Sequence, residues 1–301
     1  MTDTAATRAV ALAAEPMRIA GPQPGFFRGT VQSLRDISSH RELLGMLIGR
    51  ELKSRYKDSA LGFVWSLARP LALLFIYYVA IGKFLGAARS IPDFAVYIYT
   101  GLTAWQLFSE IVSIGTGSIV ANSGLIKKVY LPREVFPLSV VGSALFNFVI
   151  QLVILVGATV AVGHVPMGAR WTYLPLSLAV LLIFATAFAL FLSAVNVYLR
   201  DVQYLVEIAI MIGFWVSPIV YSWGQVQGAV RTGWIKDLYM ANPMTLVTMG
   251  FQRVFWVSGD SQVLPSHLGL RLGIAAAGGL IVLWLCMRVF ARLQSNFAQE
   301  L

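Results

Sequence analysis

Long apolar runs dominate the pattern of hydrophobic and polar positions beyond residue 58. Six of them occur, near residues 60–82, 94–121, 137–162, 172–199, 204–222 and 268–291. Each run has roughly the 20 residues that a helix needs to cross about 30 Å of hydrocarbon. Because the runs are continuous and do not alternate, they indicate spanning helices rather than a β-barrel. We therefore predict an all-α membrane protein with six transmembrane helices, in one domain at residues 59–301.

Residues 39–58, ahead of the first run, show a helical pattern of a different kind. At helical spacing, four leucines, Ile48 and Tyr56 fall along one broad arc, and most of the cations fall opposite. Glu51 interrupts the apolar arc, so the amphipathicity is partial. We predict an amphipathic interface helix at the membrane surface, whose cations either only set the topology or also bind the phosphates of a lipid. These cations are Arg50, Lys53, Arg55 and Lys57.

Residues 1–38 lack apolar periodicity and are expected to form a largely flexible cytoplasmic tail. The apolar stretch AVALAA at residues 9–14 is too short for the core of a signal peptide. No cleavage is therefore expected.

Composition supports a membrane protein, because 57% of the residues are hydrophobic and only 12% are charged. The mean hydropathy of +0.73 lies far above that of soluble domains. No stretch remains for a separate soluble core, so one integral domain is expected. The single cysteine, Cys286, excludes a disulfide within the chain and is expected to serve packing in the last span.

The distribution of lysine and arginine predicts the orientation, since basic residues are retained on the cytoplasmic side of a membrane. Residues 1–58, two of the connections and the C-terminal tail together place fifteen basic residues on one side. The alternate connections place six on the other side. Both termini are therefore expected to be cytoplasmic.

Four separated stretches resemble one known family of membrane proteins. They are GRELKSRYKDSALGFVWSLARPL (49–71), NSGLIKKVYLPREVFPL (122–138), YLRDVQYLVEIAIMIGFWVSPIVY (198–221) and ANPMTLVTMGFQRVFW (241–256). The chain resembles, over roughly residues 40–298, the permease subunits of ABC transporters that export polysaccharides such as O-antigens, capsules, teichoic acids and galactan. Four motifs in the same order, with matching span number and orientation, are far more specific than any one of them.

The loop between the second and third runs, about residues 122–136, is basic and long enough for a short amphipathic helix. From the residues alone it is either an ordinary positive turn or a contact with a partner. The resemblance implies a coupling helix seated in an ATPase subunit. Because the sequence has no G-x-x-x-x-G-K-[ST] loop, ATP and Mg²⁺ are expected on that partner and no cofactor on this chain. The predicted partner-interface residues are Lys127, Lys128, Tyr130, Pro132, Arg133 and Glu134.

Arg69 lies inside the first run, where a cation should face the bundle interior or a wet cavity unless it snorkels to the surface. Pro70 follows it and removes a backbone hydrogen bond, which favours a kink. Aromatic rings are the second kind of candidate, because the C–H face of a sugar lies well on an electron-rich ring. An interfacial belt or lipid contact explains any one of them equally well. The predicted substrate-binding residues are Arg50, Lys53, Arg55, Lys57, Arg69, Tyr77, Tyr78, Trp105, Phe108, Trp215 and Tyr221.

The longest external segment, residues 223–267, is apolar at helical spacing but is interrupted at Asn242 and Pro243. It is too short to cross the membrane, so we predict a pair of short re-entrant helices at the outer leaflet. The resemblance implies that they act as a gate. Arg253 either meets an exiting phosphate or faces external water.

Catalytic chemistry finds little support in the sequence. The histidines His40, His164 and His267 lie on separate segments, without an H-x-x-x-H pair or paired carboxylates. No G-x-S-x-G elbow is present. We expect no enzyme activity of its own, no metal site and no nucleic-acid partner.

These features together predict a homodimer that binds two ABC ATPase subunits and exports a lipid-linked glycan across the bacterial cytoplasmic membrane. The glycan lipid would reach the pore beside the interface helix, and its sugar chain would pass the aromatic residues. Two alternatives stay open from the residues. One is an ABC permease for a drug or a free lipid, and the other is a membrane scaffold or lipid-modifying enzyme that needs no ATPase.

Overall fold

The computed structural model describes residues 35, 37–56, 62–128 and 131–301. Most of the predicted tail, Lys57 and Tyr130 lie outside the described residues, and so do the side chains of Arg55 and Arg69.

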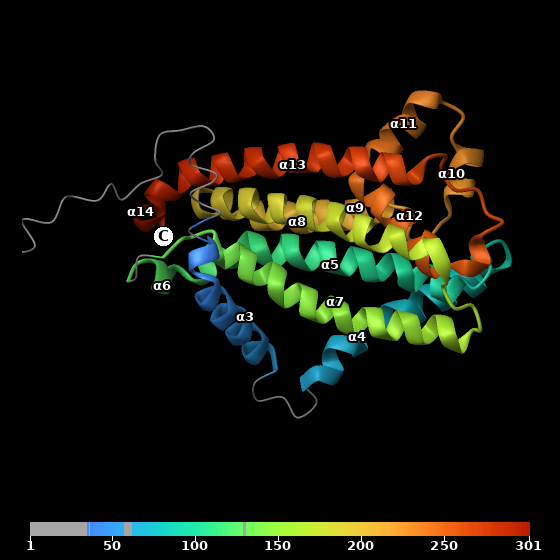
Figure 1. Ribbon diagram of the computed structural model, residues 1–301, viewed down its shortest axis with the longest axis horizontal. Helices are drawn as coiled ribbons and strands as arrows, with labels where there is room; N and C mark the ends of the chain where they lie inside the picture. Colours follow the sequence, from blue (N-terminus) through green and yellow to red (C-terminus); the bar gives the residue numbers. More distant parts are fainter. Residues whose placement is uncertain (1–34, 36, 57–61, 129–130) are drawn as a thin grey trace, which may run out of the picture.

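Four long helices run side by side along the molecule (Figure 1). They are α5 (Phe94–Ala121), α7 (Val135–Ala161), α8 (Tyr173–Tyr198) and α13 (Leu268–Leu293). Within the described ranges, three helical segments are long and apolar enough to cross a membrane, namely Val135–Ala161, Gly168–Tyr198 and Leu268–Asn296. The described chain contains no strand, so the prediction of an all-helical membrane protein is confirmed.

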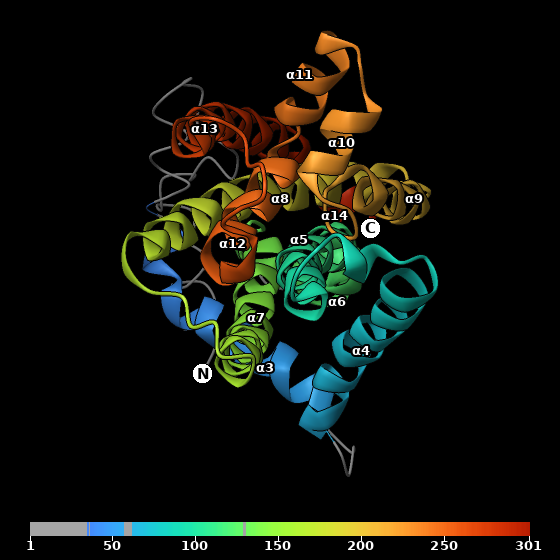
Figure 2. The same ribbon diagram turned by 90° about the vertical axis from the view of Figure 1, so that its right-hand side faces the viewer.

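Helix α5 is about as long as these three, at about 42 Å, and it forms the centre of the bundle. Figure 2 shows α7, α8, α9 and α12 around it. The hydroxyls of its buried threonines are satisfied within the helix, since Thr100, Thr103 and Thr116 each donate to the carbonyl four residues earlier. These local bonds allow polar side chains in a helix surrounded by other helices.

Two further apolar helices are shorter. Helix α4 (Gly62–Tyr77) contains Pro70 and continues as a π-helix, η1 (Tyr78–Phe84), and α9 (Val202–Val216) follows the turn after α8. The fifth predicted run extended to residue 222, whereas α9 ends at Val216. Pro218 explains the difference, because the residue before a proline favours an extended backbone and Ser217 has a ψ of 147°.

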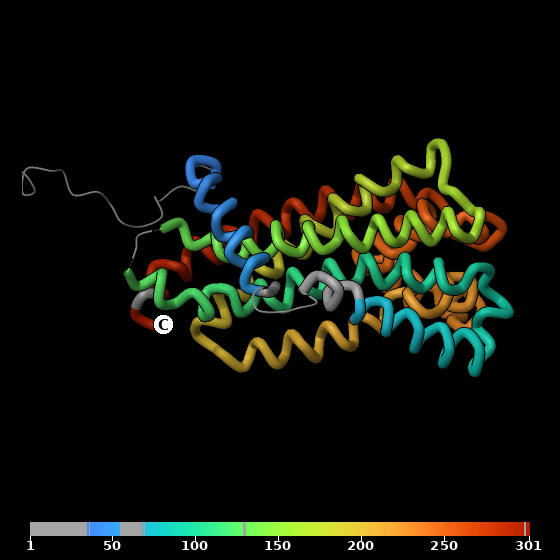
Figure 3. Tube along the Cα trace, turned by 90° about the horizontal axis from the view of Figure 1, so that it is seen from below, coloured from blue at the N-terminus to red at the C-terminus, as the bar shows by residue number. Residues whose placement is uncertain are grey.

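Helix α3 (Arg41–Tyr56) crosses the bundle obliquely near one end (Figures 1 and 3). It lies on α7, where Leu47 is buried and Ile48 fits against Gly142. A Cβ atom at position 142 would lie only 2.3 Å from the Ile48 Cδ1 atom. The same end of the bundle carries α6 (Ser123–Ile126) and α14 (Phe297–Glu300), and we call it the basic end.

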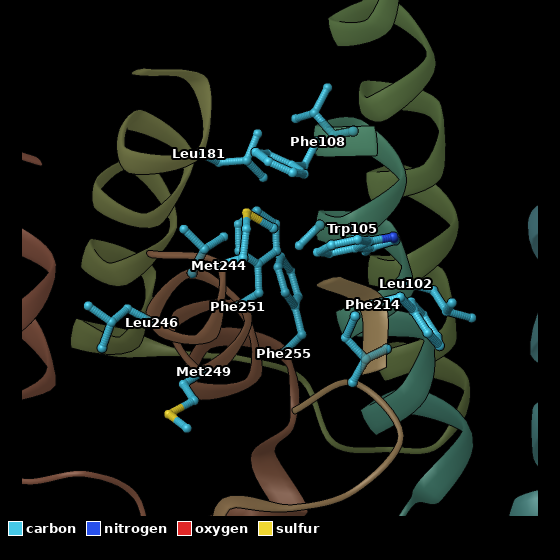
Figure 4. Packing of buried hydrophobic residues seen from close by; sticks show 14 of the residues in the cluster. Leu102, Trp105, Phe108, Leu181, Phe214, Met244, Leu246, Met249, Phe251 and Phe255 are labelled. Atoms are coloured by element: carbon cyan, nitrogen blue, oxygen red, sulfur yellow. The ribbon is translucent and has the colours of Figure 1, made fainter. Parts of the chain in front are cut away.

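Residues 223–255 form three helices at the opposite end, where the sequence predicted two. They are α10 (Trp223–Ala229), α11 (Gly233–Ala241) and α12 (Pro243–Phe255). Asn242 divides the last two, because its Oδ1 atom accepts from the Met244 backbone N–H at 3.0 Å and Pro243 occupies the first helical position. Helix α12 is inserted against α5 and α8, and its Phe251 and Phe255 are fully buried (Figure 4).

Candidate functional site: a transport path and a partner surface

An aromatic cluster joins α4, α5 and α9, and it includes several residues that the sequence selected for sugar binding. Phe214 lies at its centre, with ring centroids 5.6 Å from Tyr77, 6.0 Å from Trp105 and 5.6 Å from Trp215. Phe108 joins the cluster through Trp105, at 5.5 Å. The sequence analysis did not select Phe214, although its position beside Trp215 in the fifth run was a signal.

Burial divides this cluster into two kinds of residue. Trp105 is 7% exposed and Phe108 9%, so both are covered by side chains of their own chain (Figure 4). Trp215, by contrast, is 52% exposed. Sugar contact stays a prediction for all three, but only Trp215 presents its ring outward from the single chain.

The remaining predicted aromatics lie at the edge of the cluster. Tyr78 is half-buried, and the Nζ atom of Lys83 lies 5.6 Å from the centre of its ring. The Tyr221 hydroxyl donates to the Trp215 carbonyl at 2.7 Å. The Tyr77 and Tyr221 side chains therefore both adjoin the α9 residues Phe214 and Trp215.

The predicted phosphate-binding cations are only partly described. The side chains of Arg50 and Lys53 are exposed on α3. Arg50 donates to the Asn122 Oδ1 atom at the end of α5. This contact fixes one cation of α3 next to the central helix of the bundle.

The predicted partner surface has two parts, one exposed and one in contact with the C-terminal segment of the same chain. Lys127 and Lys128 are exposed beyond α6. Arg133 lies over the Phe297 ring, 5.7 Å from its centre, and buried Glu134 accepts a hydrogen bond from the Gln294 Nε2 atom at 3.2 Å. Pro132 beside them is half-buried.

Because the C-terminal segment of the same chain contacts Arg133 and Glu134, these residues hold the loop in place. Among the described residues of this predicted surface, the two lysines are the exposed ones.

At the opposite end, two polar clusters join the loops. Asp260 accepts from Arg253 at 3.0 Å through one carboxylate oxygen and from Arg170 through the other. Arg253, for which a phosphate contact and external water were the two alternatives, is therefore paired with a carboxylate of its own chain. Asp260 was not among the predicted site residues, because its pairing with Arg170 spans 90 residues and leaves no local pattern in the sequence.

The second cluster contains Asp93, His164 and Ser258. The His164 Nδ1 atom lies 2.6 Å from Asp93 Oδ2 and 3.1 Å from Ser258 Oγ. In a nucleophilic triad, the two ring nitrogens of the histidine face different partners. Here a single nitrogen faces both, so the arrangement joins three loops rather than activating the serine.

The turn after α9 shows how non-helical backbone is satisfied at this end. The Tyr97 hydroxyl lies 2.6 Å from the Tyr221 carbonyl and 3.1 Å from the Pro218 carbonyl, and Gln252 Nε2 donates to Pro218 at 2.7 Å. Irregular backbone is tolerated at membrane depth only where protein covers it in this way. Tyr239 closes the turn with its hydroxyl 3.4 Å from that of Tyr221, and burial raises the pKa of Tyr239, so it remains protonated.

Replacing Tyr97 by phenylalanine is expected to lower the free energy of unfolding by about 1–3 kcal/mol, because the partly buried Tyr221 carbonyl loses its donor. Thermal unfolding of the purified protein measures this effect. Tyr99→Phe is the matched control on the same helix, because the buried Tyr99 hydroxyl has no hydrogen-bond partner among the described residues. If both variants lose the same amount of stability, the hydrogen bonds of the Tyr97 hydroxyl do not stabilise the turn.

Comparison with known proteins assigns the class of this membrane protein. The ABC-2 type transporter family matches residues 42–256, so the chain belongs to that family. The resemblance predicted from the four sequence motifs is thereby confirmed.

Two relatives named for O-antigen export are similar over most of the chain. An O-antigen export system permease protein, RfbA of Myxococcus xanthus, is 29% identical over 274 residues, which cover 90% of this chain and 100% of the relative. RfbA of Klebsiella pneumoniae is also 29% identical, over 86% of this chain and 95% of the relative. The capsule polysaccharide export inner-membrane protein CtrC of Neisseria meningitidis serogroup B is 27% identical over 53% of this chain and 60% of the relative.

Proposed function

We propose that this chain is the transmembrane subunit of an ATP-driven exporter that moves a lipid-linked polysaccharide across the bacterial cytoplasmic membrane. The observation that carries the proposal is similarity over nine-tenths of the chain to a permease named for O-antigen export. No feature of the described structure favours a drug or a free lipid as cargo.

Six spans follow from the architecture in this proposal. The membrane is crossed by the three long apolar segments and also by α5, by α9 and by α4 with η1. The contacts of α5 with α4, α7, α8 and α9 support this assignment. The basic end faces the cytoplasm, in agreement with the excess of lysine and arginine there. Helix α3 then lies at the inner surface and α10 to α12 form the outer gate.

Two copies of the chain form the pore in this proposal, because a half-size permease needs a second copy to enclose a path. Two ATPase subunits bind at the basic end, and they carry ATP and Mg²⁺. Nucleotide binding and hydrolysis shift the populations of open and closed pores. The glycan lipid approaches beside α3, where Arg50 and Lys53 attract its phosphates, and the sugar chain passes the outward-facing aromatic rings.

The proposal is tested with the purified permease and ATPase complex in proteoliposomes. A lipid-linked glycan is expected to stimulate ATP hydrolysis and to appear on the far side of the membrane. Stimulation by many apolar cations without any glycan would instead identify a drug exporter. Full activity in cells that lack the ATPase would identify a protein outside this transport class.

The exposed lysines of the partner surface provide a sharper prediction. The double substitution Lys127→Glu with Lys128→Glu is expected to reduce the amount of ATPase that copurifies by at least about tenfold, because reversed charges replace attraction with repulsion. Arg89→Glu with Arg231→Glu, two exposed cations at the opposite end, is the matched control. Undiminished copurification of the ATPase with the lysine variant would exclude these lysines from the interface.

A further inference from the structure

A cavity of about 370 Å³ lies at the basic end between four helices. Its walls come from α3, the last turns of α5, the first turns of α7 and the start of α9. Small-molecule sites have volumes of roughly 300–1,000 Å³, so this cavity accepts a small ligand or one part of a larger one. A polymer does not fit inside it.

The polar atoms around the cavity are mixed in kind. Arg50 supplies a guanidinium group that also donates to Asn122, and Glu51 supplies a carboxylate from the neighbouring position of α3. Ser113 and Ser139 line the walls from α5 and α7. Because one cation stands beside one anion, the cavity is not built for phosphate alone.

Gln203 lines the cavity and has a side-chain oxygen that accepts no hydrogen bond from the described residues. Its Nε2 atom donates to the Ser113 carbonyl at 3.2 Å, which fixes the amide, and its Oε1 atom is buried without a hydrogen-bond partner among the described residues. Gly117 faces this oxygen, since a Cβ atom there would lie 3.5 Å from it. A buried acceptor without a donor costs free energy, and a ligand hydroxyl removes that cost.

Apolar side chains complete the walls. Ile114, Phe136 and Val140 lie among the polar groups. A sugar ring matches such a wall, because it combines hydroxyls that donate and accept with an apolar face of C–H groups. A phosphodiester linkage has no ionisable O–H left at neutral pH and so offers no donor to Gln203 or Glu51, and a lipid tail offers no polar atom at all.

We infer that this cavity binds the sugar unit nearest the lipid anchor of the exported glycan, with a sugar hydroxyl donating to Gln203 Oε1. The inference rests on the proposed function and extends it, because it makes the chain select its cargo by the first sugar and not only by the phosphates. Glu51 accepts from a second hydroxyl, and Arg50 lies where the sugar joins the phosphate.

The test compares lipids with and without a sugar in the complete permease and ATPase complex. The probes are polyprenyl pyrophosphates carrying one N-acetylglucosamine, glucose or galactose unit, and the bare polyprenyl pyrophosphate. Native mass spectrometry of complexes in nanodiscs gives the ratio of dissociation constants. At least one sugar-bearing probe is expected to bind about tenfold more tightly than the bare lipid. Equal binding of all probes, or equal displacement by phosphatidylglycerol, overturns the inference.

Two substitutions locate the preference in this cavity. Gln203→Leu removes the acceptor. Glu51→Gln, on a different helix, removes the negative charge and replaces one of the two acceptor oxygens with an NH2 donor, while the shape of the side chain is kept. Both are expected to reduce the preference for sugar to within about twofold of unity. Binding of the bare lipid should stay unchanged in Gln203→Leu, whereas loss of the Glu51 charge beside Arg50 should strengthen it. Gln227→Leu, at an exposed glutamine of α10, is the control and should keep the preference. Retention of the preference in both cavity variants overturns the inference.

The outcomes also separate this inference from the proposed function. If cells that carry Gln203→Leu export polymer normally and the wild type shows no sugar preference, only the inference fails. If none of the four probes binds and cells lacking the chain still export polymer, the proposed function fails.

Discussion

Trp105→Ala is expected to lower the free energy of unfolding by about 3–5 kcal/mol, the cost of removing a large buried aromatic side chain. The indole ring packs on Phe108 and Phe214, and it covers Gly213, where a Cβ atom would lie 2.8 Å from the ring. No neighbour can easily fill the space, because the surrounding groups are rigid rings on α5 and α9. Denaturant unfolding of the purified protein, followed by fluorescence, measures the change.

Trp215→Ala is the matched variant for the same prediction. Its ring is half exposed, so the substitution should change stability by less than about 1 kcal/mol. If Trp215 contacts the passing sugar, export of the polymer should nevertheless fall several-fold. Wild-type export by the Trp215 variant would exclude this residue from the transport path. A loss of unfolding free energy as large as that of Trp105→Ala would contradict the contrast between a buried Trp105 and an exposed Trp215.

The helices of the bundle were the most predictable part of the molecule. The run at residues 94–121 coincides with α5, and the run at 268–291 falls within α13, because continuous apolar segments bounded by Pro92 or Asn122 leave few alternatives. Errors occurred at local breaks in the pattern. The fifth run continues past Ser217 in hydrophobicity, but Pro218 ends the helix before it.

The candidate site was predictable in residue type but not in orientation. Trp105 and Trp215 have the same chemistry and both lie in apolar runs, and only the packing of α5 against α9 decides that one is buried and the other exposed. Contacts between distant segments left no signal in the sequence. The Gln203 amide meets α5 across 90 residues, and Tyr97 meets the turn after α9 across 121 or more. A single sequence specifies such pairs only through the completed fold.

Gly115→Leu is expected to destabilise the bundle by about 3 kcal/mol, at the upper end of the usual cost of overpacking. Gly115 on α5 faces Ala189 on α8, and a Cβ atom added there would lie 2.7 Å from the Ala189 Cβ atom and 3.4 Å from its Cα atom. Neither atom is the end of a flexible side chain, so the two helices must separate. Small residues at such contacts allow close packing in membranes, and separation loses dispersion contacts along both helices. The thermal unfolding midpoint and the yield of folded protein measure the loss.

A methyl exchange tests the same contact without a large side chain. Gly115→Ala alone should be destabilising, because the two Cβ atoms would overlap. Adding Ala189→Gly should restore much of the stability, since the new methyl group then meets only the Cα atom at the ordinary distance of 3.4 Å. Gly157→Leu is the control for helix propensity, because a Cβ atom there meets nothing within 4 Å. If the exchange gives no recovery, or if Gly157→Leu costs as much as Gly115→Leu, close approach of α5 and α8 is not what the glycine provides.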